Sequence, residues 1–178
     1  MKKILVLIIL STFYSVNAQN ETDPYQKNNE IKLNALAPLW QSFQVSYERH
    51  LNHNSSLGLS FNYVFDNTKN EKDLNYSISP YYRRYFGKKY ASGWFVEGFG
   101  MLASIDGKKI YPSEDHSIYT ENPDVINFAL GAGGGWKWVS KNGFLFEANI
   151  DYGGILVNAN KTDHTIVAKF GLSAGYRF

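Results

Sequence analysis

The last 13 residues alternate between apolar side chains and small or polar ones, and this pattern restricts the fold more than any other feature. One face of the alternation carries Ile166, Ala168, Phe170, Leu172, Ala174, Tyr176 and Phe178. The intervening residues include Lys169 and Arg177, which a helix would scatter among the apolar residues. In a strand, side chains alternate between two faces, so Lys169 and Arg177 both lie on the face opposite the apolar residues. Residues 166–178 are therefore predicted to form a β-strand with one apolar face.

Seven upstream segments repeat this pattern between turn-forming residues. In the nearest of them, Glu147 and Asp151 share the face opposite Phe144. The eight predicted strands cover residues 31–36, 43–50, 57–63, 76–83, 94–102, 128–138, 144–152 and 166–178. Two points stay open. Both faces of 94–102 are largely apolar, so its facing is ambiguous, and the glycines 133–135 could hide a β-bulge.

The composition agrees with strands that are apolar on one side. Aromatic residues make up 16% of the chain, although its mean hydropathy is −0.33. Beyond the N-terminal segment, no run approaches the roughly 18 consecutive apolar residues of a membrane-spanning helix. Strands with a single lipid-facing side combine many aromatic residues with low mean hydropathy. The sequence thus predicts an all-β fold, an eight-stranded antiparallel up-and-down transmembrane β-barrel.

The predicted connections differ in length between the two ends of such a barrel. The short ones, at the end that holds the N-terminus, are 51–55, 87–93 and 140–143. The longer ones at the other end are 66–73, 106–124 and 158–164, although the connection near Pro38 is short. Short periplasmic turns and long external loops are typical of outer-membrane barrels. We therefore predict that the charged segment 106–124 is an external loop able to meet a surface ligand.

Outward aromatic residues gather near the end with the short turns. They are Tyr47, Tyr82, Phe86, Trp94, Trp136, Trp138, Phe144, Phe146, Tyr176 and Phe178. Trp and Tyr favour a membrane–water interface because the ring is apolar and its N–H or O–H group needs water. The preference of aromatic residues for strands explains their number but not this clustering, so we predict an interfacial girdle.

The N-terminus is predicted to be a cleavable secretory signal peptide. Lys2 and Lys3 precede the apolar run 4–10, and Val16 and Ala18 supply the small residues that cleavage requires. The run is far shorter than the roughly 20 residues of a membrane-spanning helix. The predicted organisation is a signal peptide at 1–18, an N-terminal extension at 19–29 and a barrel domain at 30–178.

Charge and cysteine content exclude several classes of protein. The chain has 18 Lys and Arg residues against 16 Asp and Glu residues, and loss of Lys2 and Lys3 makes the counts equal. A nucleic-acid-binding protein would carry a basic excess, so no nucleic-acid partner is predicted. The chain contains no cysteine, which excludes a disulfide framework and a lipoprotein anchor.

The polar strand faces are predicted to place long charged side chains inside the barrel. These residues are Lys32, Glu48, Arg83, Glu97, Lys137, Glu147, Asp151, Lys169 and Arg177. The interior of an eight-stranded barrel is just wide enough for side chains, and buried charges need partners. We therefore predict a network of ion pairs that fills the lumen and leaves no conducting pore.

The sequence predicts no catalytic, cofactor-binding or metal-binding site. His50 and His53 are assigned to a solvated turn, and the other two histidines to long connections. A lipid deacylase would carry His-x-Ser on a strand, and neither His116-Ser117 nor His164-Thr165 has that spacing. Glu147 and Asp151 share a strand face about 13 Å apart, too far for a paired acid and base.

Five segments carry a resemblance to known proteins over residues 30–178. They are Lys32-Leu33-Asn34, Tyr47-Glu48-Arg49-His50-Leu51, Ser79-Pro80-Tyr81-Tyr82-Arg83, Gly93-Trp94-Phe95-Val96 and Gly175-Tyr176-Arg177-Phe178. With them the chain resembles the small OmpA/OmpX-type barrels and, more closely, a widespread family of exported barrels of unknown function. The terminal Phe178 is similar to the signal that the barrel assembly machinery reads. The resemblance implies a fold and a location in the cell outer membrane, and no activity.

The predicted function is that of an exported outer-membrane barrel of a Gram-negative cell, not an enzyme. Its role would be structural or one of surface interaction: envelope integrity, adhesion or contact with lipopolysaccharide. One alternative is a barrel enzyme that modifies envelope lipid, and another is a soluble periplasmic barrel around a small apolar ligand. The latter needs apolar side chains inside, and the loop lengths and Phe178 argue against that inversion. The sequence does not specify the surface ligand or the oligomeric state.

Overall fold

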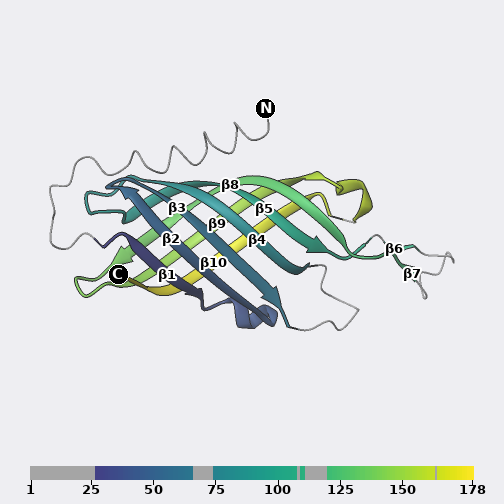
Figure 1. The fold of residues 1–178 in the computed structure, drawn as a ribbon, viewed down its shortest axis with the longest axis horizontal. Helices are drawn as coiled ribbons and strands as arrows, with labels where there is room; N and C mark the ends of the chain where they lie inside the picture. Colours follow the sequence, from purple (N-terminus) through teal and green to yellow (C-terminus); the bar gives the residue numbers. More distant parts are fainter. Residues whose placement is uncertain (1–26, 66–73, 108, 111–119, 163) are drawn as a thin grey trace, which may run out of the picture.

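A computed structural model shows that the chain forms a closed antiparallel β-barrel (Figure 1). The structure describes residues 27–65, 74–107, 109–110, 120–162 and 164–178. The barrel strands are β1 (Asn29–Asn34), β2 (Ser42–Asn52), β3 (Ser55–Val64), β4 (Leu74–Tyr85), β5 (Gly93–Ile105), β8 (Val125–Val139), β9 (Phe144–Val157) and β10 (Ile166–Arg177). Two short strands, β6 (Lys109–Ile110) and β7 (Thr120–Glu121), pair with each other between β5 and β8. All eight predicted barrel strands are confirmed, each within a few residues of its expected bounds.

Each barrel strand pairs with its neighbours in sequence, and β1 closes the barrel against β10. Ile31 of β1 pairs with Tyr176 of β10 on one side and with Tyr47 of β2 on the other, so β1 joins the last strand to the second strand. The backbone N–H of Phe178 donates to the carbonyl of Asn29, and the N–H of Asn29 donates back at 3.0 Å. The predicted antiparallel up-and-down topology is therefore confirmed. Among the described residues, no helix is long and apolar enough to cross a membrane.

The two ends of the barrel differ, as Figure 1 shows. At one end, here called the turn end, β1 begins, β10 ends, and three short connections join β2 to β3, β4 to β5 and β8 to β9. The other end, here called the loop end, carries the 3-10 helices η1 (Ala37–Trp40) and η2 (Ala159–Lys161) and the ribbon of β6 and β7. Residues 1–26, with the predicted signal peptide, and 111–119, within the predicted external loop, lie outside the described residues.

The structure resolves the two points that the alternation left open. On β5, Phe95, Glu97 and Phe99 face inward, while Trp94 and Val96 face outward. The register also runs unbroken through the glycines 133–135, and the irregularity in the β8–β9 pairing lies at Phe128 and Ala129 instead.

The inward glycines of β8 have a packing role. A β-carbon at Gly131 would overlap the ring of Phe99, and one at Gly135 would lie 2.7 Å from Cζ of Phe95. Because β8 offers no side chains here, the large rings of β5 fit inside a narrow barrel.

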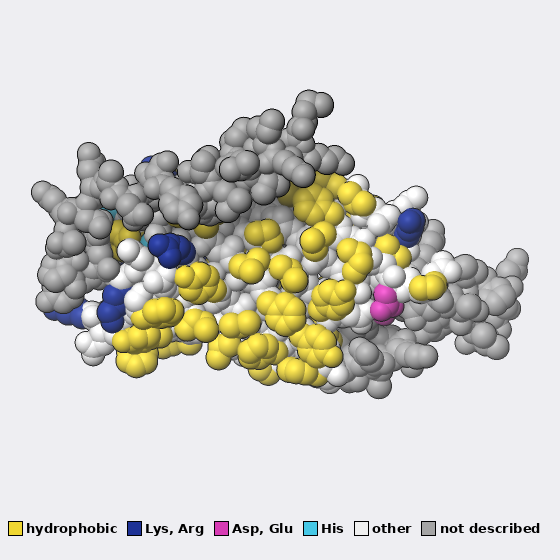
Figure 2. All heavy atoms as spheres, in the orientation of Figure 1, with side chains coloured by type: hydrophobic (Ala, Val, Ile, Leu, Met, Phe, Trp, Pro, Cys, Tyr) yellow, Lys and Arg dark blue, Asp and Glu magenta, His cyan; other side chains and the backbone are white. Residues whose placement is uncertain are grey.

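The outer surface is apolar over most of its area. Figure 2 shows hydrophobic side chains as a band across the exposed face of the strands, with Lys and Arg side chains towards the ends. The ten aromatic residues expected to face outward near the turn end are all exposed, with Trp94 at 69% and Phe144 at 60%. A second aromatic set, not anticipated from the sequence, lies near the loop end: Trp40, Phe43, Tyr63, Phe65 and Tyr76. Aromatic residues therefore flank the apolar band at both ends.

Candidate functional site in the barrel lumen

A cluster of charged side chains fills the half of the lumen nearer the turn end. This charged cluster consists of Glu30, Lys32, Glu48, His50, Arg83, Glu97, Lys137, Glu147, Asp151, Lys169 and Arg177. All nine residues predicted to be inward belong to it, and all are buried except Lys169, whose side chain is 20% exposed. The inward face of alternating strands brings them together from seven of the eight barrel strands.

Glu48 lies at the centre of the charged cluster and is fully buried. Its carboxylate accepts from Lys32 Nζ at 2.7 Å, Lys137 Nζ at 3.0 Å and Arg83 Nη1 at 3.1 Å. Hydroxyl donors complete its environment: Ser56 at 2.6 Å, Tyr81 at 3.2 Å and Tyr85. A carboxylate with this many donors is stabilised in its charged form inside a dry interior.

Glu147 and Glu97 extend the network along the barrel. Glu147 accepts from Arg83 Nη1 at 2.6 Å and from Lys32 Nζ at 2.9 Å. Arg83 also donates from Nε to Glu97, so one guanidinium links three carboxylates. Lys169 lies at the edge of the cluster, 3.5 Å from Asp151 and 3.9 Å from Glu97.

Two members of the cluster were not predicted from the sequence. Glu30 is completely buried and accepts from Lys137 Nζ at 2.6 Å and from Arg177 Nε at 2.7 Å. With Glu30, the described lumen holds five carboxylates and five Lys or Arg side chains, so its formal charge balances with neutral His50. Continuing the alternation two residues back from Lys32 would have placed Glu30 inside.

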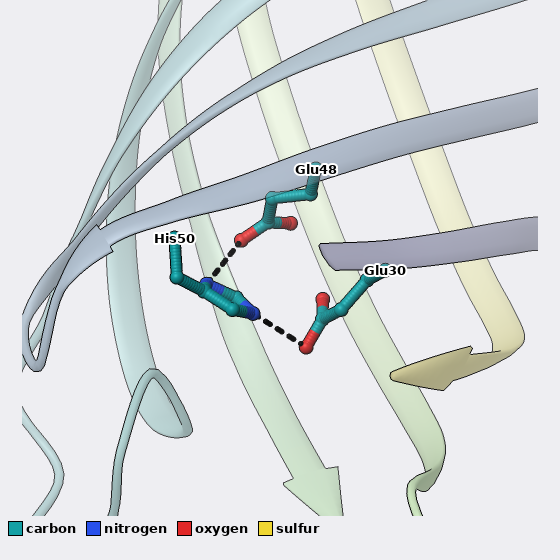
Figure 3. Close-up of side chains that lie close together, drawn as sticks. All are labelled: Glu30, Glu48 and His50. Carbon is teal, nitrogen blue, oxygen red and sulfur yellow. Dashed lines mark ion pairs between the residues drawn. The ribbon is translucent and has the colours of Figure 1, made fainter. Parts of the chain in front are cut away.

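The prediction of a solvated turn was wrong for His50. Its ring is buried within the lumen, because β2 continues to Asn52 and keeps the alternation that makes Glu48 inward. His50 Nε2 lies 3.0 Å from Glu30 Oε1, and Nδ1 lies 3.9 Å from Glu48 Oε1 (Figure 3). His53, by contrast, is exposed in the turn, where its Nδ1 lies 2.6 Å from Asn54 Oδ1.

Glu30, Glu48 and His50 together have the donor set of a metal site, with ligand atoms within 4.8 Å of one another. The ammonium of Lys137 already lies between the two carboxylates, 2.6 Å from Glu30 and 3.0 Å from Glu48. A divalent cation would have to displace it, and would add two charges to a balanced interior. The arrangement therefore fits an ion-pair network better than a metal centre.

The connection between β4 and β5 closes the turn end of the lumen. Arg177 donates to the backbone carbonyls of Tyr90 at 2.9 Å and Ala91 at 2.7 Å, and Ala91 is completely buried. The Tyr90 ring meets the His50 ring edge-on, with centroids 5.7 Å apart. Burial raises the pKa of the Tyr90 hydroxyl, and the nearby Arg177 opposes that rise. The charged cluster is thus covered from the turn end.

The lumen near the loop end is hollow, whereas the sequence led us to expect a network that fills the whole interior. A cavity of about 520 Å³, here called the loop-end cavity, lies between β1–β4 and β10. One wall is a chain of hydrogen bonds, from Asn34 Nδ2 to Gln44 Oε1 at 2.7 Å and from Gln44 Nε2 to Ser60 Oγ at 3.0 Å. Apolar side chains of β5, such as Met101 and Ile105, line the cavity as well, on the strand that pairs with β4.

The described polar groups do not form a recognisable catalytic arrangement. Ser56 donates to Glu48, and His50 lies beside Glu30 rather than beside a serine. The spacing His-x-Ser also occurs at His53 and Ser55, where His53 lies in the tight turn between β2 and β3 and Ser55 begins β3. That the protein is not an enzyme stays a prediction.

Taken together, these features define a small closed antiparallel barrel with large apolar side chains exposed on its outside and a charged cluster buried in its lumen. The chain belongs to the family described as "Protein of unknown function (DUF3575)", which matches residues 4–178. The predicted membership of a barrel family of unknown function is thereby confirmed.

A solved structure shares the fold. The N-terminal β-barrel domain of Pseudomonas aeruginosa OprF aligns with a TM-score of 0.53 and 18% sequence identity, covering 86% of this chain and 98% of that one. At this identity the likeness concerns the fold. No curated protein matches the chain.

Proposed function

We propose that this protein is an outer-membrane barrel with a structural or surface-interaction role. The observation that carries the proposal is that large apolar side chains are exposed on the outside of all eight barrel strands. Monomeric soluble proteins rarely expose contiguous apolar patches larger than a few hundred Å². The same strands place most of their charges in the lumen, and the outward Arg49 and Arg84 lie at the turn end, as expected when the solvent around the middle of the barrel is hydrocarbon.

The aromatic residues at both ends of the band support a membrane position. Trp94, Trp136 and Trp138 lie near the turn end, and Trp40 lies near the loop end. Such rings prefer the two interfaces of a bilayer, where their N–H groups reach water. The fold shared with the OprF barrel domain agrees with this proposal.

The orientation and partners follow from the two ends. The turn end has the short connections, the start of β1 and the end of β10, which matches the periplasmic side of such barrels. The loop end would then face the outside of the cell. There the connections would meet lipopolysaccharide or surface ligands, with residues 106–124 as the main contact. Export would depend on the signal peptide at 1–18, and insertion on the barrel assembly machinery reading Phe178.

The test is fractionation of cell envelopes on a sucrose gradient, followed by gel electrophoresis of unheated and boiled samples. We expect the protein in the outer-membrane fraction, with a faster band before boiling because a closed barrel stays compact. Recovery in the soluble periplasmic fraction would contradict the proposal, since the apolar band would then face water.

The role of Phe178 is tested separately with Phe178→Ala. Its ring is 51% exposed, and its backbone bonds to Asn29 do not need the ring. The variant should therefore keep the closed barrel but reach the outer membrane in much lower amounts. Ile166→Ala, at the other end of β10 and also exposed, is the matched control and should assemble normally. Equal amounts of both variants would exclude a special role for Phe178.

The external loop is tested by adding protease to intact cells. Charged connections exposed to the medium should be cut before any strand, and cleavage within 106–124 should come first. Protection on intact cells with cleavage only after lysis would reverse the proposed orientation.

A further inference from the structure

The loop-end cavity is large enough to hold a small molecule. Its volume is about 520 Å³, and binding pockets for small molecules commonly measure roughly 300–1,000 Å³. The charged cluster and the connection between β4 and β5 lie between the cavity and the turn end, so the lumen gives access to the cavity from the loop end. A ligand would enter from that end and could not pass through.

The cavity carries little net charge. Lys169 is the one Lys or Arg among the described lining residues, His164 is the one histidine, and none of them is acidic. Its ammonium is turned away into the charged cluster, where Asp151 lies 3.5 Å and Glu97 3.9 Å from it. The ring of Phe99 covers it as well, with the centroid 3.6 Å away. A charged ligand would lose its hydration here without finding an unpaired counter-charge.

The wall formed by β1–β4 offers groups that both donate and accept hydrogen bonds. Ser60 accepts from Gln44, so its own hydroxyl proton is left to donate towards a ligand. Ser77, on β4, is buried and lines the cavity where this wall meets the apolar side chains of β5. Amide and hydroxyl side chains in a row match a ligand edge that carries several hydroxyl groups, since a hydroxyl is also both donor and acceptor.

The side of the cavity formed by β5 is apolar and continuous with the core of the barrel. Met101 and Ile105 line the cavity and pack with Tyr81, Phe99 and Ile155. A ligand that fits both walls must therefore present hydroxyl groups on one side and C–H groups on the other. Sugar rings have this two-sided character.

From these features we propose that the loop-end cavity binds an uncharged, hydroxyl-rich molecule of one or two sugar rings. The proposal goes beyond the structural role above and does not depend on it, because the cavity belongs to the barrel itself. It assigns the hollow half of the lumen a recognition function that the charged half cannot perform.

The proposal is tested by calorimetry and saturation-transfer NMR on the full chain, purified in a detergent without a sugar headgroup. The probes are maltose and N-acetylglucosamine, with glucuronate and glucosamine as charged counterparts of similar size. We expect saturable binding of the neutral sugars and binding weaker by at least about tenfold for the charged ones, because burying an unpaired charge is costly.

Two variants locate the binding. Ser77→Phe places a ring in the cavity and should abolish sugar binding, whereas Ile78→Phe, the next residue and outward-facing, should leave it unchanged. Gln44→Leu should weaken binding by about tenfold through loss of its hydrogen bonds. A faster-migrating unheated band confirms that each variant is folded. The proposal is overturned if neutral sugars do not bind, if charged sugars bind equally well, or if folded Ser77→Phe binds like wild type.

Discussion

The two halves of the lumen are built on the same strands, yet one is filled and the other is hollow. Along β2, Glu48 points into the charged cluster and Gln44 lines the loop-end cavity. Along β4, Arg83 belongs to the charged cluster and Ser77 to the cavity wall. Closure of an eight-stranded barrel therefore does not by itself fill the lumen; the length of the inward side chains decides it.

The two halves of the lumen also differ in how much the removal of one side chain affects its neighbours. In the charged cluster, each carboxylate serves several cations, so removing one partner leaves an uncompensated charge in a dry interior. In the cavity wall, side chains are neutral and water can replace a lost partner. Substitutions of the same kind should thus have large effects in one half and small effects in the other.

The sharpest consequence is that the barrel does not conduct. The charged cluster and the connection between β4 and β5 close the lumen near the turn end, whatever the width of the loop-end cavity. Planar-bilayer recordings of the purified protein should show no steady single-channel current, while a wide porin in the same bilayer does. Steady currents of uniform size would mean that water crosses the charged cluster, and the two halves would then not differ as described.

The next largest effect is expected for Glu48→Ala, compared with Gln44→Ala on the same strand. Loss of Glu48 leaves Lys32, Arg83 and Lys137 without their shared carboxylate and should cost about 3–5 kcal/mol of unfolding free energy. Loss of Gln44 removes two neutral hydrogen bonds beside a cavity and should cost about 1–2 kcal/mol. Denaturant unfolding in the same lipid or detergent measures both. Equal midpoints for the two variants would show that water reaches Glu48.

The alternation of the sequence was sufficient to predict the strands, their order and the nine inward charges, because facing in a strand is a local property. The same rule would have placed Glu30, one residue before the predicted strand 31–36, and His50, the last residue of the predicted strand 43–50, in the lumen. What it could not provide was the facing of β5, where Phe95 and Phe99 make the inner face as apolar as the outer one.

The reason for those inward rings lies on another strand. They fit only because Gly131 and Gly135 of β8 lie opposite and provide the space, a match between residues more than thirty positions apart. The loop-end cavity was unpredictable for a similar reason. It is lined by β1 and β10, the first and last strands, which become neighbours only when the barrel closes.

An intermediate effect is expected for Gly133→Ala, which tests how closely the charged half is packed. A β-carbon there would overlap Asp151 Oδ1 and lie 2.5 Å from the backbone carbonyl oxygen of Ile150, so a shift is required. Overpacking of this kind typically costs about 1–3 kcal/mol. Gly98→Ala, outward on the paired strand with no atom within 4 Å of the new carbon, is the control and should be neutral or slightly stabilising. The comparison fails if both variants unfold at the wild-type midpoint.

The smallest effects are expected for one substitution, Ser→Val, made on two neighbouring strands. It should lower the unfolding free energy in the charged half of the lumen and raise it in the hollow half. Ser56 donates to Glu48 at 2.6 Å, so Ser56→Val removes a donor from a buried carboxylate and should destabilise the barrel by about 1–3 kcal/mol. Ser77 lines the cavity, where Val adds methyl groups to empty space and suits a strand, so Ser77→Val should stabilise by up to about 1 kcal/mol. Because both changes replace the same hydroxyl with the same side chain, differences in strand propensity largely cancel between them. Denaturant midpoints on opposite sides of the wild-type value are expected. Two shifts in the same direction, with similar size, would mean that the two halves of the lumen are packed and hydrated alike.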